Sequence, residues 1–291
     1  MNILLTGSSG RIGRAIRAEL GAAHRIVGID CLSGPGTDLV VDLRDTARIT
    51  PWLRGIDAVV HCAALHAPQV GLRPDSEFIE VNVAATRRLA GAARAAGVRR
   101  LVYTSTTALY GAASTPPDVA GWVDEDLPPQ PRTIYHRSKL AAEQALAEVC
   151  VPAGMALTCL RMSRCFPEPA PQMALYRLHR GIDARDVASA HAAALRLDPT
   201  GVRTFVISAA TPFLREDLPG LKADAHGVLA RRAPALVAAF AARGWALPRS
   251  IDRVYSPARA LAALGWRPRH GFESVLQAFD EGSPEVLAAG G

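Results

Sequence analysis

The chain has 291 residues, enough for one large domain or two small ones with a substantial core in either case. Hydrophobic residues make up 49% and charged residues 21%, a balance that excludes an intrinsically disordered chain. The formal net charge is +6, and almost all basic residues are arginines. Adjacent arginines occur only as a few scattered pairs, without a basic run or interleaved aromatic side chains. We therefore expect a globular protein that does not bind nucleic acid.

The N-terminal residues carry no basic segment and lead into a glycine turn by Gly7, so we expect a first strand there and a cytoplasmic location. The longest apolar runs are far shorter than the roughly 20 residues of a membrane-spanning helix, so no membrane partner is expected. The five cysteines show no Cys-x-x-Cys spacing, which indicates neither a disulfide framework nor structural zinc. No metal-ligand pattern is visible.

Short β-branched runs alternate with alanine-rich helical stretches through the first 160 residues, a pattern typical of βαβ units. The predicted strands are residues 2–6, 25–30, 38–41, 57–61, 99–105 and 155–161. The predicted helices are residues 11–20, 44–53, 75–96 and 134–151. This order predicts an α/β fold with a doubly wound parallel Rossmann sheet, and proline and glycine predict loops at 111–131 and 167–171.

The pattern changes after about residue 165. A helix is predicted at 183–197 and a short strand at 204–207, followed by further helical segments. We expect a dinucleotide-binding domain in residues 1–164, to which the chain returns near 183–207. Residues 165–291 are expected to form a smaller mixed α/β substrate-binding cap.

A glycine-rich turn follows the first predicted strand and leads at once into helical periodicity. Backbone N–H groups in such a turn can approach a pyrophosphate, and the helix N-terminus favours its negative charge. An ordinary tight turn is the alternative interpretation. The candidate cofactor-binding residues of the turn are Gly7, Ser9, Gly10, Arg11, Ile12 and Gly13.

Two aspartates follow the next predicted strands. Asp30 ends the second strand, where a carboxylate can accept hydrogen bonds from ribose hydroxyls and would repel a 2′-phosphate. NAD is therefore the expected cofactor, while Arg11 in the turn could pair with such a phosphate and leaves NADP open. Asp42 fits two interpretations equally well: contact with the adenine edge, or the cap of the following helix.

Tyr135 and Lys139 stand four residues apart at the start of a predicted helix, so they share one helix face. A phenol with a pKa near 10 is a poor acid or base at neutral pH, but a neighbouring cation lowers that pKa. Chance would produce about 0.03 such pairs in a chain with this few tyrosines and lysines. We therefore expect Tyr135 to be a proton shuttle tuned by Lys139, with an ordinary solvated helix face as the alternative.

Three hydroxyl residues follow the fifth predicted strand: Ser105, Thr106 and Thr107. Hydroxyls at the carboxyl end of a strand can hydrogen-bond a substrate oxygen and complete an acid/base site with Tyr135. Each of them alone also fits simple packing in a strand.

The motifs described so far occur in one order, together with His61-Cys62-Ala63-Ala64, with Asn82 in Val81-Asn82-Val83, and with Asp42-Leu43-Arg44. The chain resembles the extended short-chain dehydrogenase/reductases, the NAD-dependent epimerase/dehydratase family, over about residues 1–165. The resemblance adds a second set of candidate cofactor-binding residues: Asp42, Leu43, Cys62, Ala63, Ala64 and Asn82.

The same resemblance implies the catalytic roles. Tyr135 is the general acid/base, and Lys139 lowers its pKa and binds the nicotinamide ribose. The third catalytic group stands four residues before Tyr110, which makes it Thr106, with Ser105 as the near competitor. Relatives usually form homodimers, through helices that here correspond to residues 75–96 and 134–151.

The chain departs from the nucleotide-sugar members of the family after the sixth predicted strand. Arg164 stands where they usually have Asn, and only about fifteen residues lead on to Gly181 where several dozen are expected. This short segment is similar to that of the uronate dehydrogenases, which oxidise free sugar acids. Arg164, Arg177 or Arg180 could pair with a substrate carboxylate or phosphate, although each also fits an ordinary surface arginine. His66 is a candidate substrate contact or a structural histidine.

We therefore predict an NAD-dependent oxidoreductase that transfers hydride at a hydroxyl or carbonyl carbon of a small polar substrate, a sugar or sugar acid. The alternative is a nucleotide-sugar 4-epimerase or dehydratase that retains its NAD. A dinucleotide-sensing protein without catalysis is less favoured, because a sensor needs no tuned phenol.

Overall fold

The computed structural model describes residues 1–288, which group into two compact units. Unit 1 comprises Met1–Leu109, Pro131–Arg161 and Val187–Phe205. Unit 2 comprises Tyr110–Gln130, Met162–Asp186 and the described chain from Val206 onward. The chain thus passes between the units several times. The sequence analysis placed a boundary near residue 164 and a return near 183–207, and it did not foresee that Tyr110–Gln130 belongs to unit 2.

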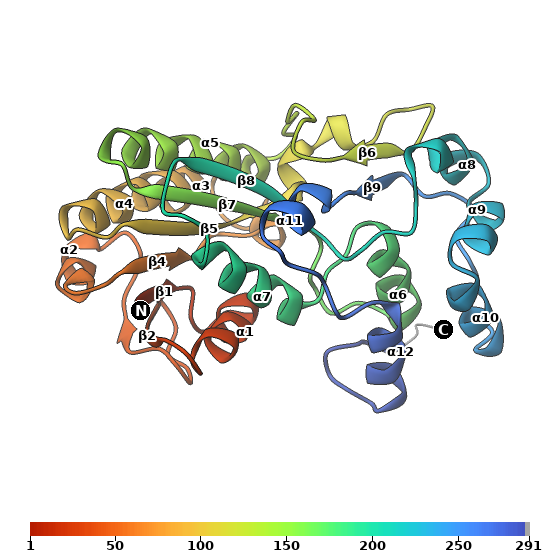
Figure 1. Ribbon diagram of the computed structural model, residues 1–291, viewed down its shortest axis with the longest axis horizontal. Coiled ribbons are helices and arrows are strands. Elements are labelled where there is room, and N and C mark those ends of the chain that lie inside the picture. The colour runs from red at the N-terminus through yellow and green to blue at the C-terminus, as the bar shows by residue number, and fades with distance from the viewer. Residues whose placement is uncertain (289–291) are drawn as a thin grey trace. The chain divides into compact units, whose positions relative to one another are not determined.

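Unit 1 is built on a seven-stranded parallel sheet, which confirms the predicted α/β fold (Figure 1). The strands are β1 (Asn2–Thr6), β2 (Arg25–Asp30), β3 (Leu39–Val40), β4 (Ala58–His61), β5 (Arg100–Thr106), β7 (Ala156–Met162) and β8 (Val202–Ile207). Their order is β3-β2-β1-β4-β5-β7-β8. The strand order reverses at β1, which pairs in parallel with both β2 and β4. Ligands of open α/β sheets bind beyond the carboxyl ends of the strands at such a reversal.

Helices cover both faces of this sheet (Figure 1). One face carries α3 (Asp75–Ile79), α4 (Thr86–Ala95) and α5 (Ile134–Cys150), and the other carries α1 (Arg11–Leu20) and α7 (Ala184–Leu195). A π-helical stretch at Glu80–Ala85 joins α3 to α4, so the predicted helix at 75–96 is continuous. The predicted helix at 44–53 is a short α2 (Thr46–Ile49) that continues as a 3-10 turn at Thr50–Leu53.

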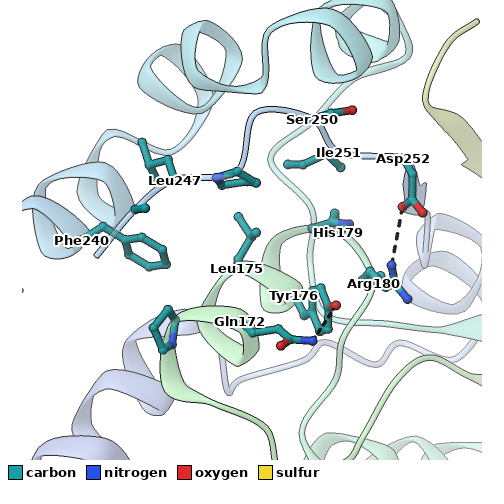
Figure 2. Close-up of a pocket in the computed structure, with 13 residues that line it drawn as sticks. Gln172, Leu175, Tyr176, His179, Arg180, Phe240, Leu247, Ser250, Ile251 and Asp252 are labelled. Carbon is teal, nitrogen blue, oxygen red and sulfur yellow. Dashed lines mark hydrogen bonds and ion pairs between the residues drawn. The ribbon is translucent and has the colours of Figure 1, made fainter. Parts of the chain in front are cut away.

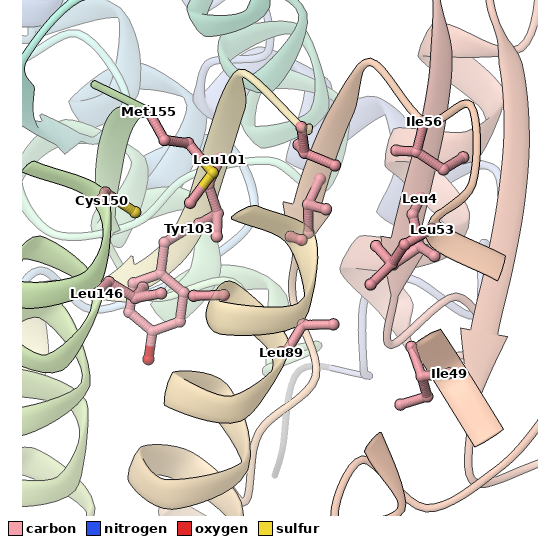
Figure 3. Close-up of a cluster of buried hydrophobic side chains, with 14 of the residues drawn as sticks. Leu4, Ile49, Leu53, Ile56, Leu89, Leu101, Tyr103, Leu146, Cys150 and Met155 are labelled. Carbon is pink, nitrogen blue, oxygen red and sulfur yellow. The ribbon is translucent and has the colours of Figure 1, made fainter. Parts of the chain in front are cut away.

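A cluster of buried hydrophobic side chains packs between the sheet and its helices. Figure 3 shows Leu101 and Tyr103 of β5 beside Leu146 of α5, with Leu89 of α4 nearby. Ala58, Val59 and Val60 of β4 are fully buried, because helices cover both faces of a parallel sheet. The carboxyl ends of the strands are thereby held on a rigid base.

Unit 2 has its own hydrophobic core, in which Phe213, Leu236 and Phe240 are almost fully buried. Its strands β6 (Gly121–Val123) and β9 (Arg253–Tyr255) pair in parallel. β6 lies in the region predicted as a loop, because a three-residue strand is recognisable only beside its distant partner. The helices are α6 (Ala170–His179), α8 (Leu218–Ala223), α9 (Ala225–Arg232), α10 (Pro234–Ala242), α11 (Ala258–Ala263) and α12 (Phe272–Asp280). Within residues 1–288, no helix has the length and apolar character needed to cross a membrane.

We expect the substitution Leu146→Ala to lower the free energy of unfolding by about 2–5 kcal/mol, because it leaves a cavity among fully buried neighbours. The matched control is Leu72→Ala, since Leu72 is 80% exposed and its loss should change stability by about 0.5 kcal/mol or less. Chemical denaturation of both variants measures the difference. Equal effects would contradict the placement of Leu146 in the core.

Candidate active site

The glycine turn between β1 and α1 can cradle a phosphate group. Gly7 has a positive φ of 73°, and a Cβ at position 13 would collide with the Gly7 carbonyl oxygen. Gly10 is the N-cap of α1, which has no side-chain cap. The first amides of α1 therefore lack a side-chain acceptor at the cap, and the close packing around Gly13 holds the turn against the helix start.

Asp30 at the end of β2 is hydrogen-bonded to this turn. One carboxylate oxygen accepts a hydrogen bond from the Ser9 amide at 2.9 Å, and the other accepts from the Leu32 amide at 3.0 Å. The carboxylate is thus held in place, and each oxygen keeps a lone pair for a further donor. This arrangement suits a carboxylate that receives the hydroxyls of a ribose.

The second aspartate, Asp42, does not cap the following helix, and its contact with the adenine edge stays a prediction. Its carboxylate forms a bidentate ion pair with the Arg44 guanidinium, with N–O distances of 2.9 and 2.6 Å. The hydrogen bond from Arg44 lowers the pKa of Asp42. The interpretation of Asp42 as a helix cap is wrong, because Asp45 caps α2 by accepting from the Arg48 amide. The neighbouring Leu43 side chain packs in the hydrophobic core, and its cofactor contact stays a prediction.

The segment after β4 is fastened to β1. The Ala63 amide donates to the Thr6 hydroxyl at 3.2 Å, and the Cys62 amide donates to the Thr6 carbonyl oxygen at 3.2 Å. The Cys62 thiol is buried and lies 2.8 Å from the Thr104 hydroxyl, and burial raises its pKa to about 12. Cys62, Ala63 and Ala64 thus follow β4 next to the glycine turn. This is where a cofactor-binding segment is expected, because the strand order reverses at β1.

Asn82 is fully buried in the π-helical stretch and connects two parts of the site. Its side-chain amide donates to the Leu65 carbonyl oxygen and to the Ser138 hydroxyl, each at 3.0 Å, and its oxygen accepts from the Leu65 amide at 2.7 Å. Asn82 was predicted to bind the cofactor. That contact stays a prediction, and the structure shows that Asn82 also joins the segment after β4 to the start of α5.

The two predicted acid/base residues lie on α5, whose first turn is capped by the Thr133 hydroxyl. Tyr135 is 8% exposed, and its hydroxyl forms a hydrogen bond with the Thr106 side chain at the end of β5. Lys139 is 2% exposed and donates to the Thr104 carbonyl oxygen at 2.8 Å. The structure therefore brings Tyr135 and Thr106 into contact, whereas the Lys139 ammonium contacts Thr104 and the Tyr103 ring.

The expected lowering of the Tyr135 pKa is wrong for this structure. Burial disfavours the phenolate and raises the pKa of Tyr135 to about 12, against the opposing effect of the Thr106 hydrogen bond. The Lys139 ammonium contacts the Thr104 carbonyl oxygen and lies 4.0 Å from the centroid of the Tyr103 ring. Desolvation of the phenol thus outweighs the tuning that the four-residue spacing alone suggested.

The hydroxyl residues after β5 differ in their contacts. The Thr106 hydroxyl accepts from the Ala108 amide at 3.1 Å in addition to its bond with Tyr135. Ser105 is 2% exposed, and its hydroxyl has no hydrogen-bond partner within the described part of the chain. Thr107 is buried as well. The contact with Tyr135 distinguishes Thr106 from its competitor Ser105.

His66 lies near the phenol. Its ring centroid is 6.3 Å from that of Tyr135, and its backbone N–H donates to Gln69 at 2.6 Å. His66 therefore remains a candidate for contact with a substrate held at Tyr135. Residues 1–288 contain no group of three or more His, Cys, Asp or Glu side chains arranged to hold a metal ion.

The three arginines considered for a substrate anion all belong to unit 2 and differ in accessibility. Arg177 is 3% exposed and pairs with Asp183 at 3.1 Å. Arg164 keeps 41% of its side chain exposed and pairs with Glu168 at 2.6 Å. Arg180 forms a looser pair with Asp252, at 3.6 Å. Arg164 and Arg180 are thus easier to reach for an incoming anion than Arg177.

Unit 2 contains a pocket of about 490 Å³ between α6 and the chain at 246–252 (Figure 2). Leu175, Phe240 and Leu247 form apolar parts of its lining, and Arg180 with Asp252 forms a charged part. The Arg180 guanidinium also lies 4.7 Å from the centroid of the Tyr176 ring. The pocket therefore offers both apolar surface and a cation.

Comparison with known proteins identifies a family. Residues 3–174 match the model of the NAD dependent epimerase/dehydratase family. An N-acetyl-alpha-D-glucosaminyl-diphospho-ditrans,octacis-undecaprenol 4-epimerase of Escherichia coli O157:H7 is 33% identical over 172 residues, which cover 57% of this chain and 50% of that protein. An L-arabinose 1-dehydrogenase (NAD(P)(+)) of Haloferax volcanii is 34% identical over 150 residues, which cover 48% of this chain and 58% of that protein.

Among solved structures, a mutated uronate dehydrogenase superposes with a TM-score of 0.67 at 19% identity, over 98% of this chain and 88% of that one, which is a likeness of fold. The chain spans about half the length of the curated relatives it matches. The family match covers more than half of the chain and includes the glycine turn, Asp30, Tyr135 and Lys139. The chain therefore belongs to the NAD-dependent epimerase/dehydratase family of extended short-chain dehydrogenase/reductases.

Proposed function

We propose that the protein is an oxidoreductase that transfers hydride between NAD and a hydroxyl- or carbonyl-bearing carbon of a small sugar or sugar acid. The observation that carries the proposal is the hydrogen bond between Tyr135 and Thr106 at the carboxyl end of β5. Lys139 stands one helical turn further along α5, buried and hydrogen-bonded to the adjacent Thr104. The phenol–hydroxyl contact thus stands at the carboxyl end of β5, and the cation is bonded to the same strand two residues before Thr106.

The residues around β1 and β2 fit NAD, the cofactor of this family. The uncapped start of α1 and the close approach at Gly13 suit a pyrophosphate, and the Asp30 carboxylate suits a ribose diol. The residues proposed to hold the cofactor are Gly7, Ser9, Gly10, Arg11, Ile12, Gly13, Asp30, Asp42, Leu43, Cys62, Ala63, Ala64, Asn82, Tyr135 and Lys139. When bound, NAD supplies the carbon that accepts or donates the hydride.

The chain's own residues move the proton. In the oxidation direction Tyr135 Oη takes the proton of the substrate hydroxyl, and in the reduction direction it returns that proton. The Thr106 hydroxyl orients the same substrate oxygen. Because burial raises the pKa of Tyr135 to about 12, the phenolate needs nearby stabilisation, which the Thr106 hydrogen bond provides in this structure. The same effect of the Lys139 ammonium is part of the proposal.

The length of the segment between β7 and α7 favours a small substrate over a nucleotide sugar. Residues 163–183 contain a single helix, α6, so this segment offers little chain to enclose a nucleoside diphosphate. Arg164 and Arg180 are the accessible candidates for a carboxylate on the substrate, whereas Arg177 is buried with Asp183. His66 and Thr107 complete the proposed substrate contacts.

The second candidate function is that of a nucleotide-sugar 4-epimerase or dehydratase with retained NAD. The match to the E. coli 4-epimerase supports it, as does the mixed apolar and cationic pocket of unit 2. We further propose a cytoplasmic homodimer that pairs through α3, α4 and α5. Gel filtration with light scattering tests the oligomeric state.

A screen of free aldoses, uronic acids and nucleotide sugars separates the two functions. The proposed dehydrogenase should form NADH with a free sugar or sugar acid and much less NADPH in parallel reactions, because Asp30 disfavours a 2′-phosphate. The epimerase should convert a nucleotide sugar without net NADH. Activity with NADP alone would contradict the role given to Asp30.

The variant Tyr135→Phe should keep NAD binding and lose about 10²–10⁴-fold in turnover, because the ring remains but the proton shuttle is gone. Calorimetry with NAD and initial-rate kinetics measure the two properties on the same preparation. Unimpaired turnover would remove Tyr135 from the mechanism.

The variant Gly13→Ala should weaken NAD binding by about tenfold or more, a cost of about 1.4 kcal/mol, because the added Cβ collides with the turn at Gly7 and Ser8. Gly91→Ala is the matched control. Its Cβ would meet no neighbour within 4 Å, and alanine suits a helix interior better than glycine. We expect this control to keep its NAD affinity, and equal losses in both variants would contradict the assignment of the turn.

A further inference from the structure

Lys139 carries an ammonium group that the fold buries almost completely. The side chain is 2% exposed, and its nitrogen donates to the Thr104 carbonyl oxygen at 2.8 Å and lies 4.0 Å from the centroid of the Tyr103 ring. Both contacts are with uncharged groups. A buried ammonium is costly without a nearby negative charge, and it shifts toward its neutral form.

Titratable groups face Lys139 from several elements. They are His61 of β4, Cys62 and His66 of the segment after β4, Tyr103 of β5, Cys159 of β7 and Glu143 of α5 itself. Tyr135 precedes Lys139 by one turn of α5, and Arg161 of β7 pairs with Glu143. Burial keeps most of this set uncharged near neutral pH: it lowers the pKa of His61 to about 3, raises that of Cys62 to about 12, and raises those of Tyr103 and Cys159. Within this set of described residues, the Glu143 carboxylate supplies the negative charge.

The position of Glu143 is set by two elements. It stands four residues after Lys139, so the two side chains lie on the same face of α5. Glu143 is 8% exposed, and Arg161 of β7 donates to both of its oxygens, with N–O distances of 3.1, 3.3 and 2.7 Å. Arg161 is equally buried, so the pair cannot turn outward to solvent. The carboxylate is therefore held in the interior on the helix face of Lys139, and its charge opposes the lowering of the Lys139 pKa by burial.

We propose that Glu143, held by Arg161, is a positioning residue that keeps Lys139 in its charged form inside the protein. The role in turnover rests on the proposed function, whereas the effect on Lys139 does not. Glu143 touches neither Tyr135 nor Thr106 in the hydrogen bonds described above, so it acts through Lys139. Removing its charge should convert Lys139 to the neutral amine at a lower pH.

The chain allows a direct measurement, because it contains only two lysines, Lys139 and Lys222. Lysine labelled with ¹³C at Cε gives one resonance for each, and Lys222→Arg assigns them. In the unchanged protein we expect Lys139 to titrate near pH 8, because burial lowers its pKa from 10.5 to about 8 while Glu143 opposes the shift. Lys222 of α8 serves as the internal reference.

Two variants separate charge from shape. Glu143→Gln keeps the side-chain shape and loses the charge, so the titration of Lys139 should move to lower pH by about one unit or more. Glu143→Asp keeps the charge and shortens the side chain, so Lys139 should titrate close to its original pH. If Glu143 is only structural, the thermal midpoint falls in both variants while the Lys139 titration stays in place, which overturns the proposal.

A buried arginine left without its carboxylate can prevent folding of Glu143→Gln. The double variant Glu143→Gln, Arg161→Gln removes both charges and keeps a hydrogen-bonding pair, and it should also lower the titration pH of Lys139. An unchanged titration in the double variant overturns the proposal.

In the folded variant that lacks the carboxylate, the alkaline limb of kcat should move to lower pH with Lys139, since turnover needs the ammonium. A protein that shows the NMR shift but has no dehydrogenase activity refutes the proposed function alone.

Discussion

The candidate site depends on one buried hydrogen bond, from the Lys139 ammonium to the main-chain oxygen of Thr104. A cation taken out of water needs such a partner, and this one joins α5 to β5 at the carboxyl end of the strand. Tyr135 lies one turn before Lys139, and Thr106 lies two residues after Thr104. The bond therefore sets the helix against the strand in a register that brings the phenol to the Thr106 hydroxyl.

Thr104 also fixes β5 on its other side. Its hydroxyl lies 2.8 Å from the Cys62 thiol and 2.8 Å from His191 Nε2, while His191 Nδ1 contacts the Val187 carbonyl oxygen. The backbone of Thr104 thus binds α5. Its side chain binds two further elements, which are the segment after β4 and helix α7. A catalytic group supported in this way on strands and helices can hold its geometry more precisely than one on a loop. Sequence reasoning missed Thr104, because a backbone acceptor leaves no signature in residue type.

Several site residues were predictable because their signals are local. The glycine turn combines a strand, a close backbone approach and a helix start within a dozen residues, and Asp30 follows from the end of the next strand. The placement of Tyr135 and Lys139 on one face of α5 follows from helical periodicity. The same periodicity places Glu143 on this face of α5, four residues after Lys139. Its proposed role could not be inferred from the sequence, because it depends on the ion pair with Arg161 of β7.

The features that the sequence did not reveal share a different cause, which is dependence on other parts of the chain. β6 forms only beside β9, and the buried pairing of Arg177 with Asp183 was not apparent from residue type. Asp42 pairs with Arg44 while Asp45 takes the capping role that Asp42 was given as one alternative. Asn82 proved to connect Leu65 and Ser138, contacts that bring together three separate segments.

The sequence by itself determined the parallel α/β fold and pointed to the glycine turn and the candidate acid/base residues, because periodicity and close spacing act over a few residues. Tertiary structure alone decided how these groups are charged. Burial raises the pKa of Tyr135 and lowers that of Lys139, and the opposing carboxylate of Glu143 is held by an arginine from another element. Desolvation is a property of everything packed around a side chain, so no local pattern of residues can report it.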